Sequence, residues 1–244
     1  MMNWNSEGYV LSVRKHGETS AIIDVLTSDY GRHLGLVRGG ISRKIRPILQ
    51  PGNKINVEWS ARLSEHLGSF TVEPLVSKAA QIMEDRLSLS ALNSLCAMAR
   101  ECLPEREAHH DVYQAFGVVL NNIGIHEIWP ALYIKWESGL LSAMGYGLDL
   151  KSCAATGSKD NLTHVSPRSG RAVSAEAAKP YADKLFLLPE FLISNSSFSP
   201  DDLQAGLELT GFFLETRLQW GVNRTLPDER RRMIQLLNDT GYVS

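Results

Sequence analysis

Six basic side chains gather in one glycine-rich stretch, residues 30–54, "YGRHLGLVRGGISRKIRPILQPGNK", which contains no Asp or Glu. They are Arg32, Arg38, Arg43, Lys44, Arg46 and Lys54. Uncompensated guanidinium and ammonium groups can hold phosphates, so this stretch is a candidate contact for a polyanion. A second interpretation stays open, in which the cations only keep a turn soluble and the glycines supply its backbone geometry.

Aromatic rings near the stretch would suit a single-stranded nucleic acid, which needs a cationic groove for its backbone and rings on which bases stack. Tyr30 and His33 flank the run, and Trp59 lies on a neighbouring predicted strand. We therefore predict DNA contacts at Arg32, Arg38, Arg43, Lys44 and Arg46, extended by Arg14 and Lys15. Arg168 and Arg171 are secondary candidates, because exposed arginines on loops commonly serve only solubility.

Short strands are the elements that would position the basic stretch. Up to residue 76 the apolar residues alternate with polar ones between closely spaced turn signals. The runs are centred on residues 9–13, 21–25 and 34–36 and continue at 54–63 and 68–76. Five short strands without room for crossover helices predict a small antiparallel barrel.

Beyond about residue 85 the apolar period becomes helical, so the chain as a whole is of the α+β class. Helix faces are predicted for Leu92, Leu95, Cys96 and Ala99, for Val112, Phe116, Val119 and Leu120, for residues 128–145, and for Leu203, Leu207, Leu214 and Leu218 after a start at Ser199–Pro200. Residues 149–177 form a long excursion that is poor in aliphatic side chains. Residues 1–80 carry ten basic and seven acidic residues, a net of +3, against 15 and 20 in the remainder, so the strand-rich part is the better contact for a polyanion.

Catalytic signatures are missing from the chain. It contains no G-x-x-x-x-G-K-S/T, no H-E-x-x-H and no G-x-S-x-G, and the "HHD" at residues 109–111 predicts a helix start. A cysteine hydrolase that pairs Cys153 with His164 remains a formal alternative. We expect no enzyme activity and no cofactor.

The chain is expected to be cytoplasmic. Its start has no basic segment followed by an apolar one, and no window approaches the roughly 18 apolar residues of a membrane span. Three cysteines are an odd and sparse set, which favours reduced thiols over disulfides.

Several short motifs occur in a characteristic order along both halves of the chain. They are "GETS" at residues 17–20, Thr27 to Gly31, the pair Gly39 and Gly40, "LQP" at 49–51, "LSAMGYGLDLKSC" at 141–153 and "VSPRSGRAVS" at 165–174. This order resembles the RecO family of bacterial DNA repair proteins.

The resemblance implies an oligonucleotide-binding (OB-fold) barrel, here residues 1–78, and a helical domain, here residues 80–244, with a zinc-binding insertion in many members. It also implies a recombination mediator rather than an enzyme. Such a protein binds single- and double-stranded DNA, anneals complementary strands, works with RecR and helps to load RecA onto DNA covered by single-strand binding protein. The alternative is a scaffold whose helical domain receives a partner peptide, without a direct DNA role for the basic run.

One departure from the family concerns zinc. Members with zinc carry two C-x-x-C pairs, whereas this chain has Cys153, Thr156, Ser174 and Ala177 at the four positions. Structural zinc normally takes four Cys or His ligands, so one thiol is insufficient even with His164 nearby. We predict no bound metal and a degenerate zinc-ribbon-like insertion.

Overall fold

The computed structural model describes residues 2–222 and 225–243, without the side chains of residues 219–222. The protein is of the mixed α+β class and divides into two units, Met1–Gly124 and Ile125–Ser244, each described by itself below. Among the described residues, no helix is long and apolar enough to cross a membrane.

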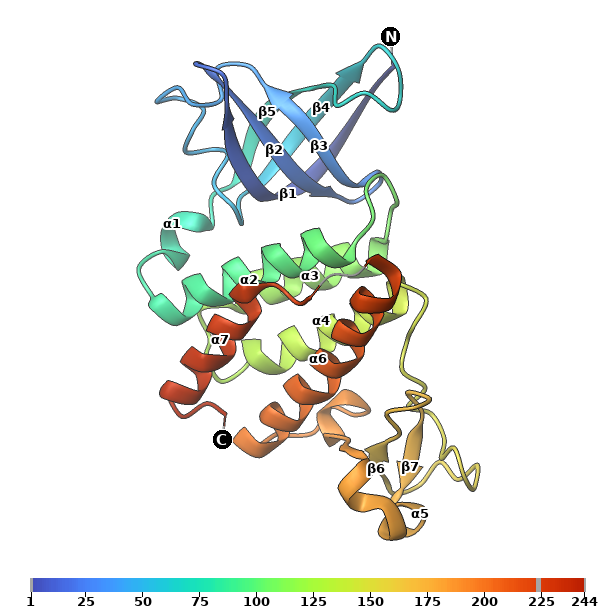
Figure 1. Cartoon of the computed structure of the whole chain (residues 1–244). Coiled ribbons are helices and arrows are strands. Elements are labelled where there is room, and N and C mark those ends of the chain that lie inside the picture. Colours follow the sequence, from blue (N-terminus) through green and yellow to red (C-terminus); the bar gives the residue numbers. More distant parts are fainter. Residues whose placement is uncertain (1, 223–224, 244) are drawn as a thin grey trace. The chain divides into compact units, whose positions relative to one another are not determined.

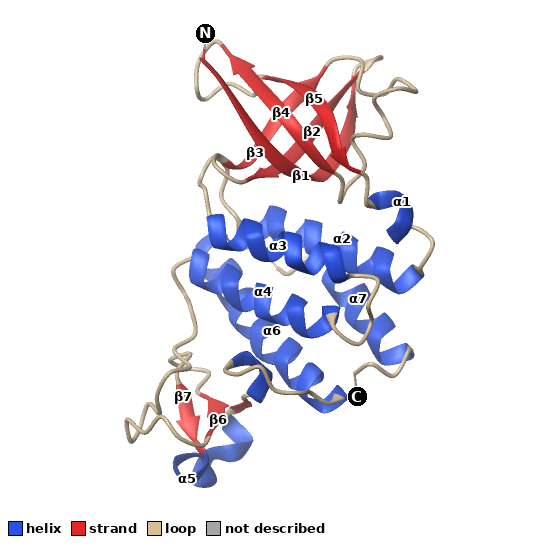
Figure 2. Cartoon of the chain, turned by 180° about the vertical axis from the view of Figure 1, so that it is seen from behind, coloured by secondary structure: helices blue, strands red, loops and turns tan. Residues whose placement is uncertain are grey.

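Five strands of the first unit close into a barrel (Figures 1 and 2) in the order β1-β2-β3-β5-β4. They are β1 (Met2–His16), β2 (Ser20–Thr27), β3 (Gly31–Val37), β4 (Lys54–Ala61) and β5 (Ser69–Val76). All five lie where the alternating apolar pattern predicted strands. The number of strands and the closed sheet are therefore confirmed.

The expectation of a wholly antiparallel sheet is wrong at one seam. Strands β3 and β5 are parallel, paired at Leu36 and Ser69, and the Leu36 amide donates to the Gly68 carbonyl at 3.1 Å. The other four contacts are antiparallel. Parity explains the exception, because directions cannot alternate all the way around a closed ring that has an odd number of strands.

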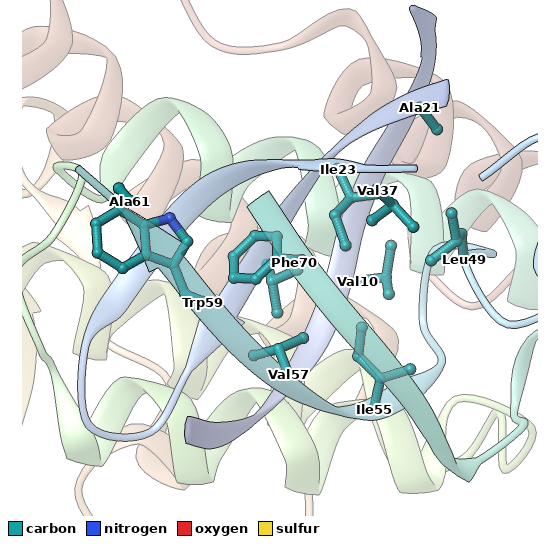
Figure 3. Close-up of a cluster of buried hydrophobic side chains, with 11 residues drawn as sticks. Val10, Ala21, Ile23, Val37, Leu49, Ile55, Val57, Trp59, Ala61 and Phe70 are labelled. Atoms are coloured by element: carbon teal, nitrogen blue, oxygen red, sulfur yellow. The ribbon is translucent and has the colours of Figure 1, made fainter. Parts of the chain in front are cut away.

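The barrel interior is filled by the inward-facing side chains of the alternating strands (Figure 3). They are chiefly Val10, Ile23, Val25, Val37, Ile55, Val57, Trp59 and Phe70, all of them buried. A bulge in β1 between Val10 and Ser12 shifts the register against β2. Leu49, from the loop between β3 and β4, completes this core with no exposed surface.

Helices α1 (Ala79–Ile82), α2 (Arg86–Cys102) and α3 (His110–Asn122) complete the first unit. Both predicted apolar faces, Leu92 to Ala99 and Val112 to Leu120, are buried, and α3 begins at the predicted "HHD". The ring of Phe116 lies 5.2 Å from the ring of Tyr9 on β1. This packing of helix on barrel explains why the first unit extends to Gly124. A domain boundary between residues 78 and 80 stays a prediction.

The second unit contains the helices α4 (Trp129–Ala143), α6 (Pro200–Val222) and α7 (Asp228–Asp239). The predicted start of the long helix is confirmed, because the Ser199 amide donates to the Asp202 carboxylate at 2.8 Å and the Asp202 amide donates to Ser199 Oγ at 3.2 Å. Its four predicted leucines are buried.

The excursion after α4 contains a small sheet that the sequence did not predict. Strands β6 (Leu162–Val165), β7 (Ala172–Ser174) and β8 (Phe186–Leu187) are ordered β7-β6-β8, and helix α5 (Ala175–Ala178) follows β7. The 3₁₀ turns η1 (Lys179–Lys184) and η2 (Glu190–Leu192) lie on either side of β8. Strands of two to four residues are too short to show an alternating pattern.

Candidate nucleic-acid interface

The connection between β3 and β4, residues 38–53, is a compact loop that we call the basic loop. Ser42 organises its middle, accepting the Ile45 amide at Oγ (3.3 Å) and the Arg46 amide at its carbonyl (2.9 Å). Asn53 is 3% exposed and donates its side-chain amide to the carbonyls of Pro47 and Ile48, at 2.9 and 3.2 Å. These bonds and the buried Leu49 fix the loop from beneath, which leaves its cations on the outside.

Four predicted contact residues extend from this loop into solvent. Arg38, Arg43, Lys44 and Arg46 are all exposed, and no ion pair joins any of them to another residue in the described part of the chain. Exposed charges without partners keep their hydration and can exchange it for phosphate oxygens. The structure therefore brings together the second half of the predicted cationic run.

The two ends of the run are arranged differently. The Arg32 side chain is 14% exposed, and its guanidinium lies 2.6 Å from Asp24 and 3.6 Å from Glu105. Its Nε also donates to the Leu103 carbonyl at 3.1 Å. Burial raises the pKa of Asp24, and the Arg32 charge opposes that rise. Lys54, at the other end, pairs with Glu7 at 2.5 Å.

A groove of about 560 Å³ opens on the barrel beside the basic loop, and we call it the barrel groove. Arg38 and Ile45 line it on the loop side, while Ser60, Arg62 and Phe70 line it from β4 and β5 and the loop between them. Arg62 is not among the contacts predicted from the sequence, because this single exposed arginine lies outside the basic run. Ser60 pairs with Ser69, the residue at the β3–β5 seam, and this pairing brings the nearby Arg62 to the groove.

The three rings noted in the sequence do come together, around Trp4. Trp4 stacks on Tyr30 with ring centroids 4.2 Å apart and an interplanar angle of 14°, and on Trp59 at 5.7 Å and 18°. The His33 ring lies 5.0 Å from Trp59. His33 and Trp59 are only 3% and 2% exposed, so they belong to the core. Tyr30 is 38% exposed and is the most solvent-accessible residue of this aromatic group.

Arg14 and Lys15 lie exposed near the end of β1, opposite Ile22 and Ala21 of β2. The turn that follows them contacts the basic loop, because the Ile41 amide donates to the Thr19 carbonyl at 3.3 Å. The β1–β2 hairpin thus places two more cations on a segment bonded to the basic loop.

The two secondary candidates belong to the second unit. Arg168 is exposed in the connection between β6 and β7. Arg171 pairs with Asp149 at 3.3 Å, and the Ala172 amide donates to the Asp149 carbonyl at 2.9 Å. The Arg171 charge is thus partly neutralised within the insertion.

The four zinc-ligand positions do not fit a metal. The Cys153 sulfur accepts hydrogen bonds from the Ser174 amide and hydroxyl, at 3.2 and 3.3 Å, so the first and third positions are neighbours that now share a hydrogen bond. His164 instead pairs with Thr163 at 2.9 Å. Across the described residues, no three His, Cys, Asp or Glu side chains are grouped so that they could hold a metal ion.

The closed barrel and the exposed cations of the basic loop together define a class, an α+β protein built around a candidate nucleic-acid-binding barrel. Residues 1–77 match the family described as "Recombination protein O N terminal", and residues 83–226 match "Recombination protein O C terminal". The chain belongs to the RecO family of DNA repair and recombination proteins, as its motifs predicted.

Curated relatives cover nearly the whole chain. It is 50% identical over 237 residues to the DNA repair protein RecO of Cereibacter sphaeroides, covering 97% of this chain and 99% of that protein. Identity to the DNA repair protein RecO of Roseobacter denitrificans is 48% over 235 residues, 96% of this chain and 98% of that one. Identity to the DNA repair protein RecO of Caulobacter vibrioides is 46% over 237 residues, which cover 97% of this chain and 98% of that one.

Proposed function

We propose that the barrel is an OB-fold that binds single- and double-stranded DNA through the basic loop and the barrel groove. The observation that carries this proposal is the set of four exposed cations on a fixed loop, without ion pairs among the described residues, at the rim of a closed five-stranded sheet. OB-folds bind nucleic acids with strand faces and loops of this kind. The parallel β3–β5 seam beside the groove is compatible with that fold.

The proposed contact set differs from the one predicted from the sequence by the loss of Arg32 and the addition of Arg62. Arg38, Arg43, Lys44 and Arg46 hold phosphates, and Arg14, Lys15 and Arg62 extend the path. Arg32 is left out of the phosphate contacts, because its guanidinium is already divided among two carboxylates and a carbonyl. Arg168 and the partly neutralised Arg171 provide a weaker second contact from the insertion.

Such a surface can anneal strands without catalytic groups. Two complementary strands repel each other through their phosphates, and a cationic rim that binds both lowers that repulsion while the bases pair. We propose that this mediator acts in the cytoplasm with RecR and single-strand binding protein and assists RecA loading. It uses no cofactor, and the zinc-ribbon-like insertion is held by hydrogen bonds such as that between Cys153 and Ser174.

We place the partner contacts on an exposed apolar patch of the second unit, formed by Leu187 and Phe212. Leu187 is 60% and Phe212 39% exposed, and Phe212 lies 4.8 Å from the Phe186 ring next to Leu187. An exposed apolar patch of this kind suits a partner peptide. The scaffold role and the DNA role are therefore assigned to different parts of the chain.

The test is strand annealing and salt-dependent DNA binding by the full-length variant Arg43→Ala/Lys44→Ala/Arg46→Ala. Losing three phosphate contacts should lower the slope of log affinity against log salt by about 2 for single strands and should slow annealing. A matched variant, Lys135→Ala/Lys184→Ala/Arg232→Ala, removes the same charge from exposed positions of the second unit outside the insertion and should behave like the wild type. Equal slopes for the two variants would exclude the basic loop as the DNA site.

A further inference from the structure

A second pocket, of about 360 Å³, lies against the basic loop and is lined mainly by apolar surface. The loop separates it from the barrel groove, since Ile45 lines the groove whereas Arg46 and Pro47 line the second pocket. Its far wall is formed by Ala79, Ala80 and Met83, in and just after α1. The volume falls within the roughly 300–1,000 Å³ typical of small-molecule sites.

The walls of this pocket are held together by one buried side chain. Asn53 donates to the carbonyls of Pro47 and Ile48 and accepts the Ala79 amide at Oδ1, at 3.1 Å. It therefore joins the basic loop to the start of α1. Because all three of these bonds are satisfied inside the protein, the pocket is preorganised rather than formed by a flexible surface.

The pocket offers both apolar surface and polar or charged groups, which suits a nucleotide with its flat base and its charged phosphate. Ala80 and Met83 are exposed apolar side chains that can cover the faces of a base, while Gln50 and Ser77 offer polar groups to its edges. Arg46, which also lines the pocket, has no ion pair with a described residue and can hold the adjoining phosphate. Arg46 thus belongs both to the proposed phosphate path and to the pocket, which makes the two continuous.

We propose that this pocket binds one unpaired, unstacked nucleotide of the bound strand, with its base against Ala80 and Met83 and its phosphate on Arg46. The proposal rests on the proposed DNA-binding function of the basic loop and adds a ligand to it. Unstacking costs least for a base that is not paired. The pocket therefore favours single strands over duplex, a preference that phosphate contacts alone do not provide.

The probe is a single-stranded oligonucleotide of about 16 nucleotides with 2-aminopurine between adenines, whose stacking quenches its fluorescence. Full-length protein should raise the fluorescence at saturation. Ala80→Phe, which fills the pocket from an exposed position, should abolish the rise and weaken single-strand binding about tenfold, with duplex binding unchanged. Gln81→Phe adds the same ring at the neighbouring exposed position outside the pocket and should match the wild type.

Two results would overturn the proposal. One is a wild-type protein that binds the oligonucleotide without unstacking the probe, a measurement that needs no variant to fold. The other is an unchanged fluorescence rise with Ala80→Phe. In either case, a salt slope that still depends on Arg43, Lys44 and Arg46 would leave the proposed DNA-binding function standing.

Discussion

The guanidinium of Arg106 donates a hydrogen bond to the carbonyl oxygen of His66 at 2.9 Å, between positions 40 residues apart in the sequence. It also donates to the carbonyls of Ser64 and Glu65, so one side chain binds three successive peptide groups of the β4–β5 loop. Arg106 has a positive φ of 65°, and its amide donates to the Arg32 carbonyl at 2.8 Å. The α2–α3 connection therefore fixes the loop that carries Arg62 to the barrel groove.

We predict that Arg106→Lys weakens single-strand binding about fivefold while the salt slope stays that of the wild type. Lysine keeps the charge but lacks the planar fork that reaches several carbonyls, so the loop and Arg62 lose their fixed position. Hydrogen exchange of residues 62–68 should accelerate in the variant. A binding loss seen with Arg106→Ala and not with Arg106→Lys would show that Arg106 contributes only its charge.

Gly31 and Gly17 give a matched pair for testing how closely the α2–α3 connection approaches β3. Both have positive φ, 66° and 60°. A Cβ at Gly31 would lie 2.0 Å from the Glu107 carbonyl oxygen, whereas a Cβ at Gly17 would meet nothing within 4 Å. Gly17→Ala should cost about 1 kcal/mol of unfolding free energy, the price of the left-handed backbone alone.

Gly31→Ala should cost at least about 3 kcal/mol, because the backbone of Glu107 must also move. Urea unfolding of both full-length variants measures the difference. Equal losses in the two variants would mean that the connection does not pack tightly on β3.

The barrel could be predicted because each of its strands is long enough to show alternation, and its parallel seam could have been inferred from the odd strand number. The structural role of Arg32 in an ion pair could not be predicted from the sequence. In the β2–β3 hairpin Arg32 is opposite Leu26 and diagonal to Asp24, so the ion pair depends on a register that the cationic run does not encode. Arg62 and Trp4 were missed for a related reason, since Arg62 reaches the site through the β3–β5 seam and Trp4 through the pairing of β1 with β4, and both pairings join strands far apart in the sequence.

Glu137 of α4 and Arg230 of α7 form a buried ion pair in the second unit. Arg230 donates from Nε to Oε1 at 2.6 Å and from a terminal nitrogen to Oε2 at 2.9 Å, and Thr210 of α6 donates to Oε2 at 2.6 Å. Glu137 is fully buried and Arg230 is 6% exposed. Three helices thus share one carboxylate.

Glu137→Gln should lower the unfolding free energy by about 3 kcal/mol, because the arginine charge stays buried beside a neutral amide. Thr210→Val removes one hydroxyl donor to this carboxylate and should cost about 2 kcal/mol. Single-strand DNA binding by the folded variants should not change, since both residues are fully buried and neither is a proposed DNA contact. If Glu137→Gln lowers the unfolding free energy no more than Thr210→Val does, the Glu137–Arg230 ion pair is not shielded from water.

Cys96 on α2 should make the stability of the protein fall at alkaline pH. The residue is 3% exposed, and burial raises the pKa of its thiol from 9.0 to about 12. Above pH 9 the unfolded chain releases this proton and the folded chain keeps it, so the unfolded state binds fewer protons and the unfolding free energy falls as pH rises. The limiting slope is about 1.4 kcal/mol per pH unit.

Cys96→Ala isolates this effect, because burial also raises the pKa of Tyr9 and Tyr113 from 10.0 and adds a further loss at higher pH. The stability curves of the wild type and the variant should run parallel below about pH 8. Between pH 9 and 10 they should converge, because only the wild type has the Cys96 thiol and loses stability through it. Urea unfolding across this range under reducing conditions measures both curves. A constant difference between them would mean that the Cys96 thiol ionises alike in the folded and unfolded chain.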